Sequence, residues 1–107
     1  MTEILLLVRS AAASPEVEDE YNAWYDEVHV PQILERVPGV LSARRYRLAD
    51  AQLAPADMLP VAYLAEYRIE TDDPAAAAAA LGAALTDGTL DMSRTIARPE
   101  ILFYRPV

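Results

Sequence analysis

The spacing of apolar and polar side chains along the chain predicts four β-strands and two helices. Residues 3–9 are apolar at nearly every position, which is typical of a central strand covered on both faces. Residues 61–70 alternate between apolar and polar side chains, the pattern of a strand with one buried face. Residues 40–48 and 100–105 complete the predicted strands. Residues 50–60 contain two prolines and no stable repeat, which indicates a loop.

The first helix is predicted from apolar residues that recur at helical spacing and form one continuous face: Val17, Tyr21, Trp24, Tyr25 and Val28. Ser14 and Pro15 mark its start, because serine can cap free backbone N–H groups and proline at the first helical position loses no hydrogen bond. Pro31 has no N–H to donate, so we expect the helix to end or kink near Val30, with a further turn through residues 33–34.

The second helix is predicted in the alanine-rich run of residues 75–85. Residues 71–74 place capping side chains before a proline, and residues 87–88, Asp-Gly, end the run. Low-complexity disorder is the alternative interpretation of so many alanines. Leu81 and Leu85, spaced at i and i+4, favour the helix.

The order β-α-β-β-α-β predicts a ferredoxin-like α+β fold, a four-stranded antiparallel sheet with two helices on one face. At 107 residues and 11.8 kDa the chain has room for one domain, residues 1–107. The strands carry Leu, Ile, Ala and Tyr on both sides, so leaving the second sheet face in water would be costly. We therefore expect a homodimer with twofold symmetry in which two sheets pack face to face.

Composition narrows the classes of function. A formal net charge of −8 and a pI of about 4.4 make nucleic acid and anionic membrane poor partners. The chain has no cysteine and one histidine, which excludes disulfides, thiolate chemistry and a multi-histidine metal site within one chain. The apolar stretch at residues 4–8 is too short for a signal peptide or a membrane span, so we expect a cytoplasmic protein.

The segment of residues 21–31, YNAWYDEVHVP, resembles the Y-N-x-W-Y-x-x-x-H-x-P motif of the EthD-like group in the dimeric α+β barrel superfamily. The Pro-Gly-Val turn at residues 38–40, the Arg-Arg-Tyr of residues 44–46 and the strand at residues 63–67 are similar to that group as well. The resemblance implies a dimeric α+β barrel. It leaves the reaction open, because relatives include cofactor-free cyclases and monooxygenases, lactone isomerases, haem-degrading enzymes and proteins with no settled activity.

His29 is the first candidate for chemistry. It follows Tyr25 by four residues and Asn22 by seven, so its imidazole borders the aromatic face of the helix and the predicted cleft. An imidazole titrates near neutral pH and is a common general acid or base. The alternative is a histidine that only interacts with the free carbonyls at the end of a helix. The match to the motif favours the functional role.

Polar and aromatic side chains around His29 are the predicted substrate-binding groups. The aromatic residues of the helix face serve as core or as pocket wall, and the strand tyrosines can donate phenolic hydrogen bonds to a developing enolate. Asn22 either caps a local carbonyl or holds a ligand oxygen. The complete predicted set is Asn22, Trp24, Tyr25, Arg44, Tyr46, Tyr63 and Tyr67.

Arg44 is the arginine of the second strand that we expect to be partly buried, because strict alternation places it on one face with Val40 and Tyr46. It then either clamps a substrate carboxylate or phenolate, or forms an ion pair with Glu66.

The leading hypothesis is a small enzyme without metal or cofactor, of lyase, isomerase, dehydratase or cyclase type. It would act on an apolar, aromatic or polyketide-like carbonyl compound, with His29 moving the proton. The second hypothesis is a non-catalytic protein that binds the same small molecules or assists an oxygenase pathway. A monooxygenase with His29 as an axial haem ligand is the third.

Overall fold

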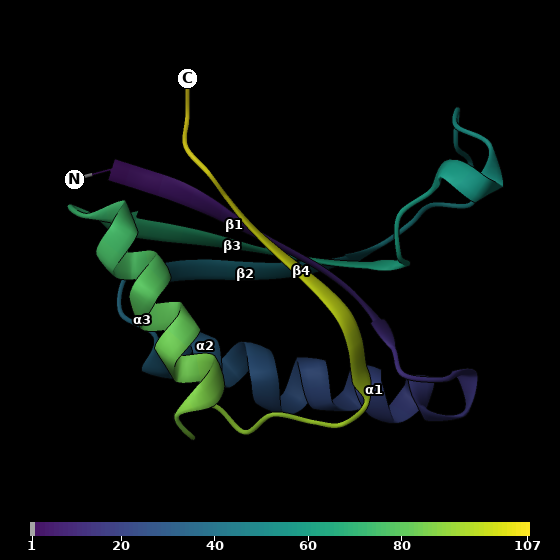
Figure 1. Ribbon diagram of the computed structural model, residues 1–107, viewed down its shortest axis with the longest axis horizontal. Coiled ribbons are helices and arrows are strands. Elements are labelled where there is room, and N and C mark those ends of the chain that lie inside the picture. The colour runs from purple at the N-terminus through teal and green to yellow at the C-terminus, as the bar shows by residue number, and fades with distance from the viewer. Residues whose placement is uncertain (1) are drawn as a thin grey trace.

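The computed structural model, which describes residues 2–107, contains the predicted order of strands and helices (Figure 1). The strands form one antiparallel sheet in the order β2-β3-β1-β4, which confirms the ferredoxin-like α+β fold. β1 is central, as predicted, because it pairs with β3 along one edge and with β4 along the other. Only its helix-facing side is buried, so the prediction that both of its faces are covered does not hold within one chain. The strands are β1 (Thr2–Ala12), β2 (Val40–Arg47), β3 (Tyr63–Thr71) and β4 (Ile96–Tyr104).

The first helical segment runs without a break from residue 15 to residue 36. Its successive parts are η1 (Pro15–Val17), α1 (Glu18–Trp24), η2 (Tyr25–His29) and α2 (Val30–Arg36). Ser14 forms no capping bond through its side chain, so the predicted cap at this position is wrong, and a 3₁₀ turn takes its place. Pro31 does not end the helix, because the chain widens into the π-helical turn η2 just before it and resumes as α2.

The second helix, α3 (Pro74–Thr86), starts as predicted. The Asp73 carboxylate caps the helix, because it accepts a hydrogen bond of 3.2 Å from the backbone N–H of Ala76. Pro74 follows it at the first helical position. The segment between β2 and β3 extends away from the rest of the molecule and contains only the short turn η3 (Ala56–Met58) (Figure 1). None of the helices in residues 2–107 is long and apolar enough to cross a membrane.

The core lies between the helices and one face of the sheet. Alternate residues of β1 and β3 point toward the helices and are buried, whereas their neighbours on the opposite sheet face are partly or fully exposed. Burial of these side chains is the main favourable term in folding. The largest side chains in this core are Leu6, Tyr21, Tyr25, Ile33, Tyr67 and Ile69.

The last strand differs from its prediction. β4 begins at Ile96 rather than at residue 100, and it includes Pro99. The strand can contain a proline because it lies at the edge of the sheet, where a missing backbone N–H is tolerated. The pairing of β1 with β4 shifts between Arg9 and Ala11. Arg98, opposite this shift, has a positive φ of 49°, which is rare for a residue other than glycine.

Candidate active site between the first helix and the sheet

A β-bulge in β2 decides which arginine faces the helices. Val40 pairs with Ile69, but the register shifts before Ser42, so the alternation expected from Val40 moves by one residue. Arg45 therefore lies opposite the buried Ala65, and Arg44 lies opposite Glu66 on the other face and is exposed. The prediction that Arg44 is the partly buried arginine is wrong, because strict alternation does not hold across the bulge.

Arg45 lies within a cluster of aromatic side chains, which consists of Tyr21, Trp24, Tyr25, His29, Tyr63 and Tyr67. Its side chain is only 14% exposed, and its guanidinium donates hydrogen bonds to Asn22 Oδ1 at 2.8 Å and to Asp26 Oδ1 at 2.9 Å. The guanidinium carbon lies 4.3 Å from the centroid of the Tyr25 ring, and the rings of Tyr21 and Tyr63 lie within 5.5 Å. Cation–π contacts of this kind hold a positive charge against aromatic faces without removing its electrostatic effect on neighbouring groups.

Tyr63 joins the helix to the sheet through its hydroxyl. This hydroxyl donates to Glu18 Oε1 at 2.9 Å and accepts a hydrogen bond of 3.1 Å from Asn22 Nδ2. The structure thus brings together Asn22 and Tyr63, two of the predicted site residues. Tyr21 forms a second buried link to the sheet, because its hydroxyl and Ser10 Oγ lie 2.6 Å apart.

The π-helical turn places His29 beside Trp24. Val30 donates its backbone N–H to the carbonyl of Tyr25, five residues earlier. In a regular α-helix two side chains five positions apart point about 140° away from each other. Here the Trp24 and His29 rings stack, with centroids 4.5 Å apart and planes at 25°, and the Tyr25 ring meets His29 edge to face at 5.0 Å. π-Turns of this kind often occur at functional sites.

Burial sets the protonation of the cluster. The pKa of His29, which is 4% exposed, is lowered to about 4 by loss of hydration and by the positive charge of Arg45. Burial raises the pKa of Tyr25 to about 12, and burial together with the neighbouring Tyr25 raises the pKa of Tyr67 further. At neutral pH the imidazole is therefore uncharged and both phenols keep their protons.

Four polar atoms of this cluster are buried without a well-aligned hydrogen bond in residues 2–107: Tyr25 Oη, Tyr67 Oη, His29 Nδ1 and Arg45 Nε. The Tyr25 and Tyr67 hydroxyls nevertheless lie near enough to interact with each other. Buried polar groups are satisfied in most proteins, and each exception is costly. Here the exceptions belong to side chains that contact or electrostatically influence one another. The neutral imidazole can accept a proton, and each of the two phenols can donate a hydrogen bond.

The structure places the other predicted binding residues differently. Trp24 covers the cluster from outside, half-buried, and its indole N–H donates to the carbonyl oxygen of Asp91 at 2.8 Å. Tyr46 is 40% exposed and lies opposite Leu64 on the far face of the sheet, where the Arg44 guanidinium lies 5.5 Å from its ring centroid. Tyr46 and Arg44 are therefore separated from His29 by the sheet.

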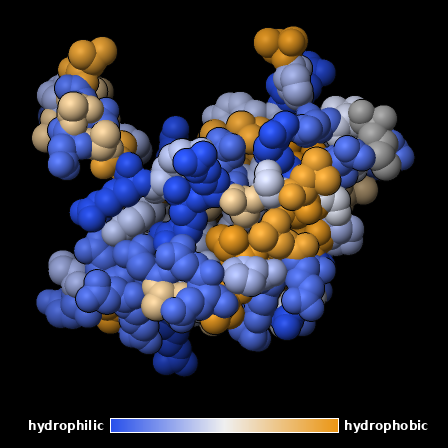
Figure 2. Space-filling model, turned by 180° about the vertical axis from the view of Figure 1, so that it is seen from behind, coloured by the Kyte–Doolittle hydropathy of each residue, from blue (hydrophilic) through white to orange (hydrophobic). Residues whose placement is uncertain are grey.

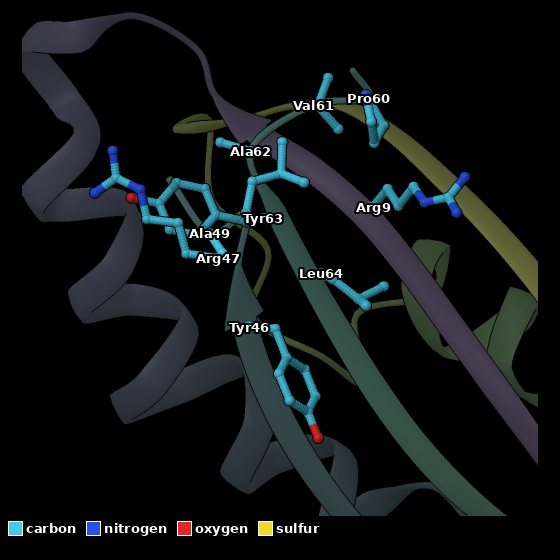
Figure 3. Close-up of a pocket in the computed structure, with 10 residues that line it drawn as sticks. Arg9, Tyr46, Arg47, Ala49, Pro60, Val61, Ala62, Tyr63 and Leu64 are labelled. Carbon is cyan, nitrogen blue, oxygen red and sulfur yellow. The ribbon is translucent and has the colours of Figure 1, made fainter. Parts of the chain in front are cut away.

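Two cavities border the Tyr63 end of the cluster, and His29 lines neither of them. The first, about 280 Å³, lies under the segment between β2 and β3 and includes Tyr46 and Leu64 (Figure 3). In this view Arg9 and Arg47 extend to opposite sides of the cavity, so their charges do not converge on one point. The second cavity, about 290 Å³, lies on the other side of Tyr63, next to Glu18.

Sequence reasoning missed Arg45, Ser10 and Glu18. Glu18 stood in an acidic run typical of a solvated helix start, yet it is partly buried and accepts the hydrogen bond of Tyr63. Ser10 interrupts an otherwise apolar strand face, and that interruption was the available signal for a buried polar contact. Nothing local in the sequence distinguished Arg45 from Arg44.

The surroundings of His29 bear on whether the cluster could hold a metal ion or a haem. Within residues 2–107 no three His, Asp or Glu side chains gather as ligands of a metal ion would. A haem ligand needs open space in front of an imidazole nitrogen. His29 is buried, with Trp24 stacked on one side of its ring and Tyr25 against it, so this geometry does not favour the haem hypothesis.

The molecule is thus a ferredoxin-like α+β domain with a histidine-bearing aromatic cluster between its first helix and its sheet. Among solved structures it is similar to an ethyl tert-butyl ether D (EthD) family protein from Bacillus halodurans, with 14% sequence identity over 100% of both chains and a TM-score of 0.51. No protein-family model matches the chain, and no curated protein matches it. The structural likeness confirms the EthD-like resemblance at the level of the fold.

Proposed function

We propose that this protein is a small-molecule enzyme of lyase, isomerase, dehydratase or cyclase type that needs no cofactor. Its substrate would be an apolar, aromatic or polyketide-like carbonyl compound. The main support is the group of four buried, unpartnered polar atoms on His29, Tyr25, Tyr67 and Arg45, which lie among aromatic rings. Aromatic surroundings with a few convergent polar groups are typical of small-molecule sites.

The proposed chemistry is proton transfer next to a carbonyl group. Neutral His29 takes a proton from the carbon adjacent to the carbonyl, and the electron pair of the broken C–H bond moves to the carbonyl oxygen. Tyr25 and Tyr67, both protonated at neutral pH, donate hydrogen bonds to this oxygen, and the charge of Arg45 stabilises the enolate. His29 then returns the proton to carbon or to a leaving group.

Substrate access requires the cluster to open, because His29 is buried. Trp24 is the side chain best placed to move, since it is half-buried and its indole N–H has a single hydrogen bond, to the backbone of Asp91. Turning it outward would uncover one face of the imidazole.

The test is exchange of hydrogen for deuterium at the methyl group of acetophenone in D₂O, followed by NMR. We expect the protein to accelerate exchange and the His29→Gln variant to lose the acceleration by about 100-fold or more. Glu35→Gln, on the exposed surface of α2, is the matched control and should exchange as the wild type does. Exchange that survives in the His29→Gln variant would contradict the role of this residue.

A non-catalytic binding protein is the second candidate, and the pKa of His29 favours it. A base with a pKa of about 4 has a weak driving force for accepting a proton from carbon. This candidate predicts that acetophenone changes the fluorescence of Trp24 in a saturable manner, in both wild type and His29→Gln, with no deuterium exchange in either protein.

We also propose that the chain forms a homodimer through the sheet face that the helices leave open. The register places Leu5, Leu7, Leu64 and Leu102 on this face. Seen from behind, the molecule shows a patch of apolar side chains bordered by hydrophilic ones (Figure 2). A face of this kind is unusual on a monomer and typical of an interface.

Sedimentation velocity tests the dimer. We expect the wild type to sediment at twice the mass of one chain and Leu102→Lys to sediment as a monomer. Leu34→Lys is the matched control, because Leu34 lies on α2 and is as exposed as Leu102, 41% against 40%. A wild type that stays monomeric at millimolar concentration would exclude this interface.

A further inference from the structure

The second cavity beside Tyr63 combines a mostly apolar wall with two charged side chains. It measures about 290 Å³ and lies where the chain leaves β1 and enters the first helix. Most of its wall is small and apolar, and its charged side chains are Glu18 and Arg98. These two side chains form no ion pair with each other in the part of the chain that the structure describes. The residues that line the cavity are Ala11, Ala12, Ala13, Ser14, Pro15, Glu18, Ala62, Tyr63 and Arg98.

Arg98 adopts a strained backbone conformation at this cavity. Its φ of 49° lies in the left-handed region, where the Cβ of an L-residue is disfavoured and glycine is the usual choice. Pro99, which follows, restricts the backbone of Arg98 further. The Arg98 side chain has no hydrogen bond or ion pair with any other residue in the range 2–107. No side-chain contact of Arg98 within the described residues therefore compensates for this strain. Strained residues of this kind cluster at functional sites.

Glu18 supplies the second polar group. One of its oxygens, Oε1, accepts the hydrogen bond of the Tyr63 hydroxyl at 2.9 Å, and Asn22 donates to the same hydroxyl. Within residues 2–107 the structure shows no donor on the other oxygen, Oε2. A carboxylate held in this way has one free acceptor position beside the cavity, ready for a donor on a ligand.

We propose that this cavity binds a small aromatic carboxylic acid that also carries a hydroxyl group. The guanidinium of Arg98 pairs with the carboxylate, since its planar fork matches that geometry. The ligand hydroxyl donates to Glu18, and the ring lies against the alanine side chains. A volume of about 290 Å³ is at the small end of ligand sites and suits a single ring. His29 plays no part here, so this proposal goes beyond the proposed enzyme function and does not depend on it.

Isothermal titration with three related compounds tests the chemistry of the ligand. We expect 4-hydroxybenzoate to bind at least about tenfold more tightly than 4-hydroxybenzamide, which lacks the charge, and than 4-methoxybenzoate, which lacks the donor. Equal affinity for all three compounds, or no heat from 4-hydroxybenzoate at millimolar concentration, would overturn the proposal.

Variants of Arg98 test the site itself. Arg98→Gln should weaken binding of 4-hydroxybenzoate at least about tenfold, whereas Arg94→Gln, an exposed arginine a few residues earlier, should bind as the wild type does. Arg98→Gly removes the guanidinium and relieves the positive φ. It should therefore lose binding while its thermal unfolding midpoint stays the same or rises. Wild-type affinity in either Arg98 variant would show that this residue does not hold the ligand.

Discussion

The Trp24 indole lies stacked on the His29 imidazole, with 4.5 Å between the ring centroids and 25° between the ring planes. The π-helical turn between them produces this contact, because a regular α-helix separates side chains five positions apart. Trp24 is the only tryptophan of the chain and His29 the only histidine. The fluorescence of the protein should therefore report on the protonation of its candidate catalytic base.

Trp24 fluorescence should change with pH at a midpoint near 4. A protonated imidazole in contact with an indole quenches its emission, and burial beside Arg45 lowers the pKa of His29 to about 4. The measurement is a fluorescence titration of the folded protein from pH 8 to pH 3.5. His29→Gln is the control and should lack this step. A wild-type midpoint near 6.5 would show a hydrated imidazole and an open cluster instead.

The free energy of unfolding should fall as the pH is lowered from 6.5 toward 4. In this range the unfolded chain binds a proton at His29 and the folded chain does not, so protonation favours unfolding. The loss attributable to His29 reaches about 3 kcal/mol at the acid end. It is measured by urea unfolding at several pH values, as the difference between wild type and His29→Gln. Identical pH dependence in the two proteins would contradict the lowered pKa.

Arg45→Ala and Arg44→Ala should differ strongly in stability. Arg45→Ala removes the hydrogen bonds to Asn22 and Asp26 and a cation over three aromatic rings, and we expect a loss of about 2–3 kcal/mol. Arg44 is exposed on the other sheet face, so its replacement should change stability by less than about 0.5 kcal/mol. Denaturant unfolding measures both. A larger loss of stability from Arg44→Ala than from Arg45→Ala would mean that β2 pairs with β3 without its bulge.

Replacing two buried tyrosines by phenylalanine should change stability in opposite directions. The Tyr67 hydroxyl is buried and no well-aligned hydrogen bond satisfies it, so Tyr67→Phe should stabilise the protein by about 1 kcal/mol. The Tyr21 hydroxyl is hydrogen-bonded to Ser10, so Tyr21→Phe should destabilise it by a similar amount, about 1 kcal/mol. Thermal unfolding of the two variants decides the point. A destabilised Tyr67→Phe would reveal a hydrogen-bond partner for that phenol.

Replacing two glycines by alanine should change the stability of the protein in opposite directions. Gly39 has a φ of 84°, and a Cβ there would lie 2.5 Å from the carbonyl oxygen of Glu70, so Gly39→Ala should cost more than about 2 kcal/mol. Gly82 lies within α3 with open space around a Cβ, so Gly82→Ala should stabilise by about 0.5–1 kcal/mol. Both values come from the same unfolding experiment. A tolerated Gly39→Ala would show that the turn into β2 is looser than the structure indicates.

The fold and part of the candidate site were predictable from local patterns. Alternation identified β3, apolar continuity identified the central strand β1, and Asp73 before a proline marked the start of α3. The aromatic helix face predicted Tyr25 and His29 as neighbours, and the structure confirms their contact at 5.0 Å. These features depend on residues a few positions apart, so the chain encodes them without reference to its tertiary structure.

The remaining features depend on how the strands pair and on which groups become buried. Arg45 rather than Arg44 faces the cluster because one extra residue in β2 is accommodated against β3, and no local pattern specifies that bulge. The sequence by itself determined the order of the elements, the motif on the first helix and the presence of one histidine. Only the tertiary structure decided that Tyr67 from β3 lies beside Tyr25 and that the His29 imidazole is shielded from solvent. The reason is that burial and contacts between distant segments exist only in the packed chain.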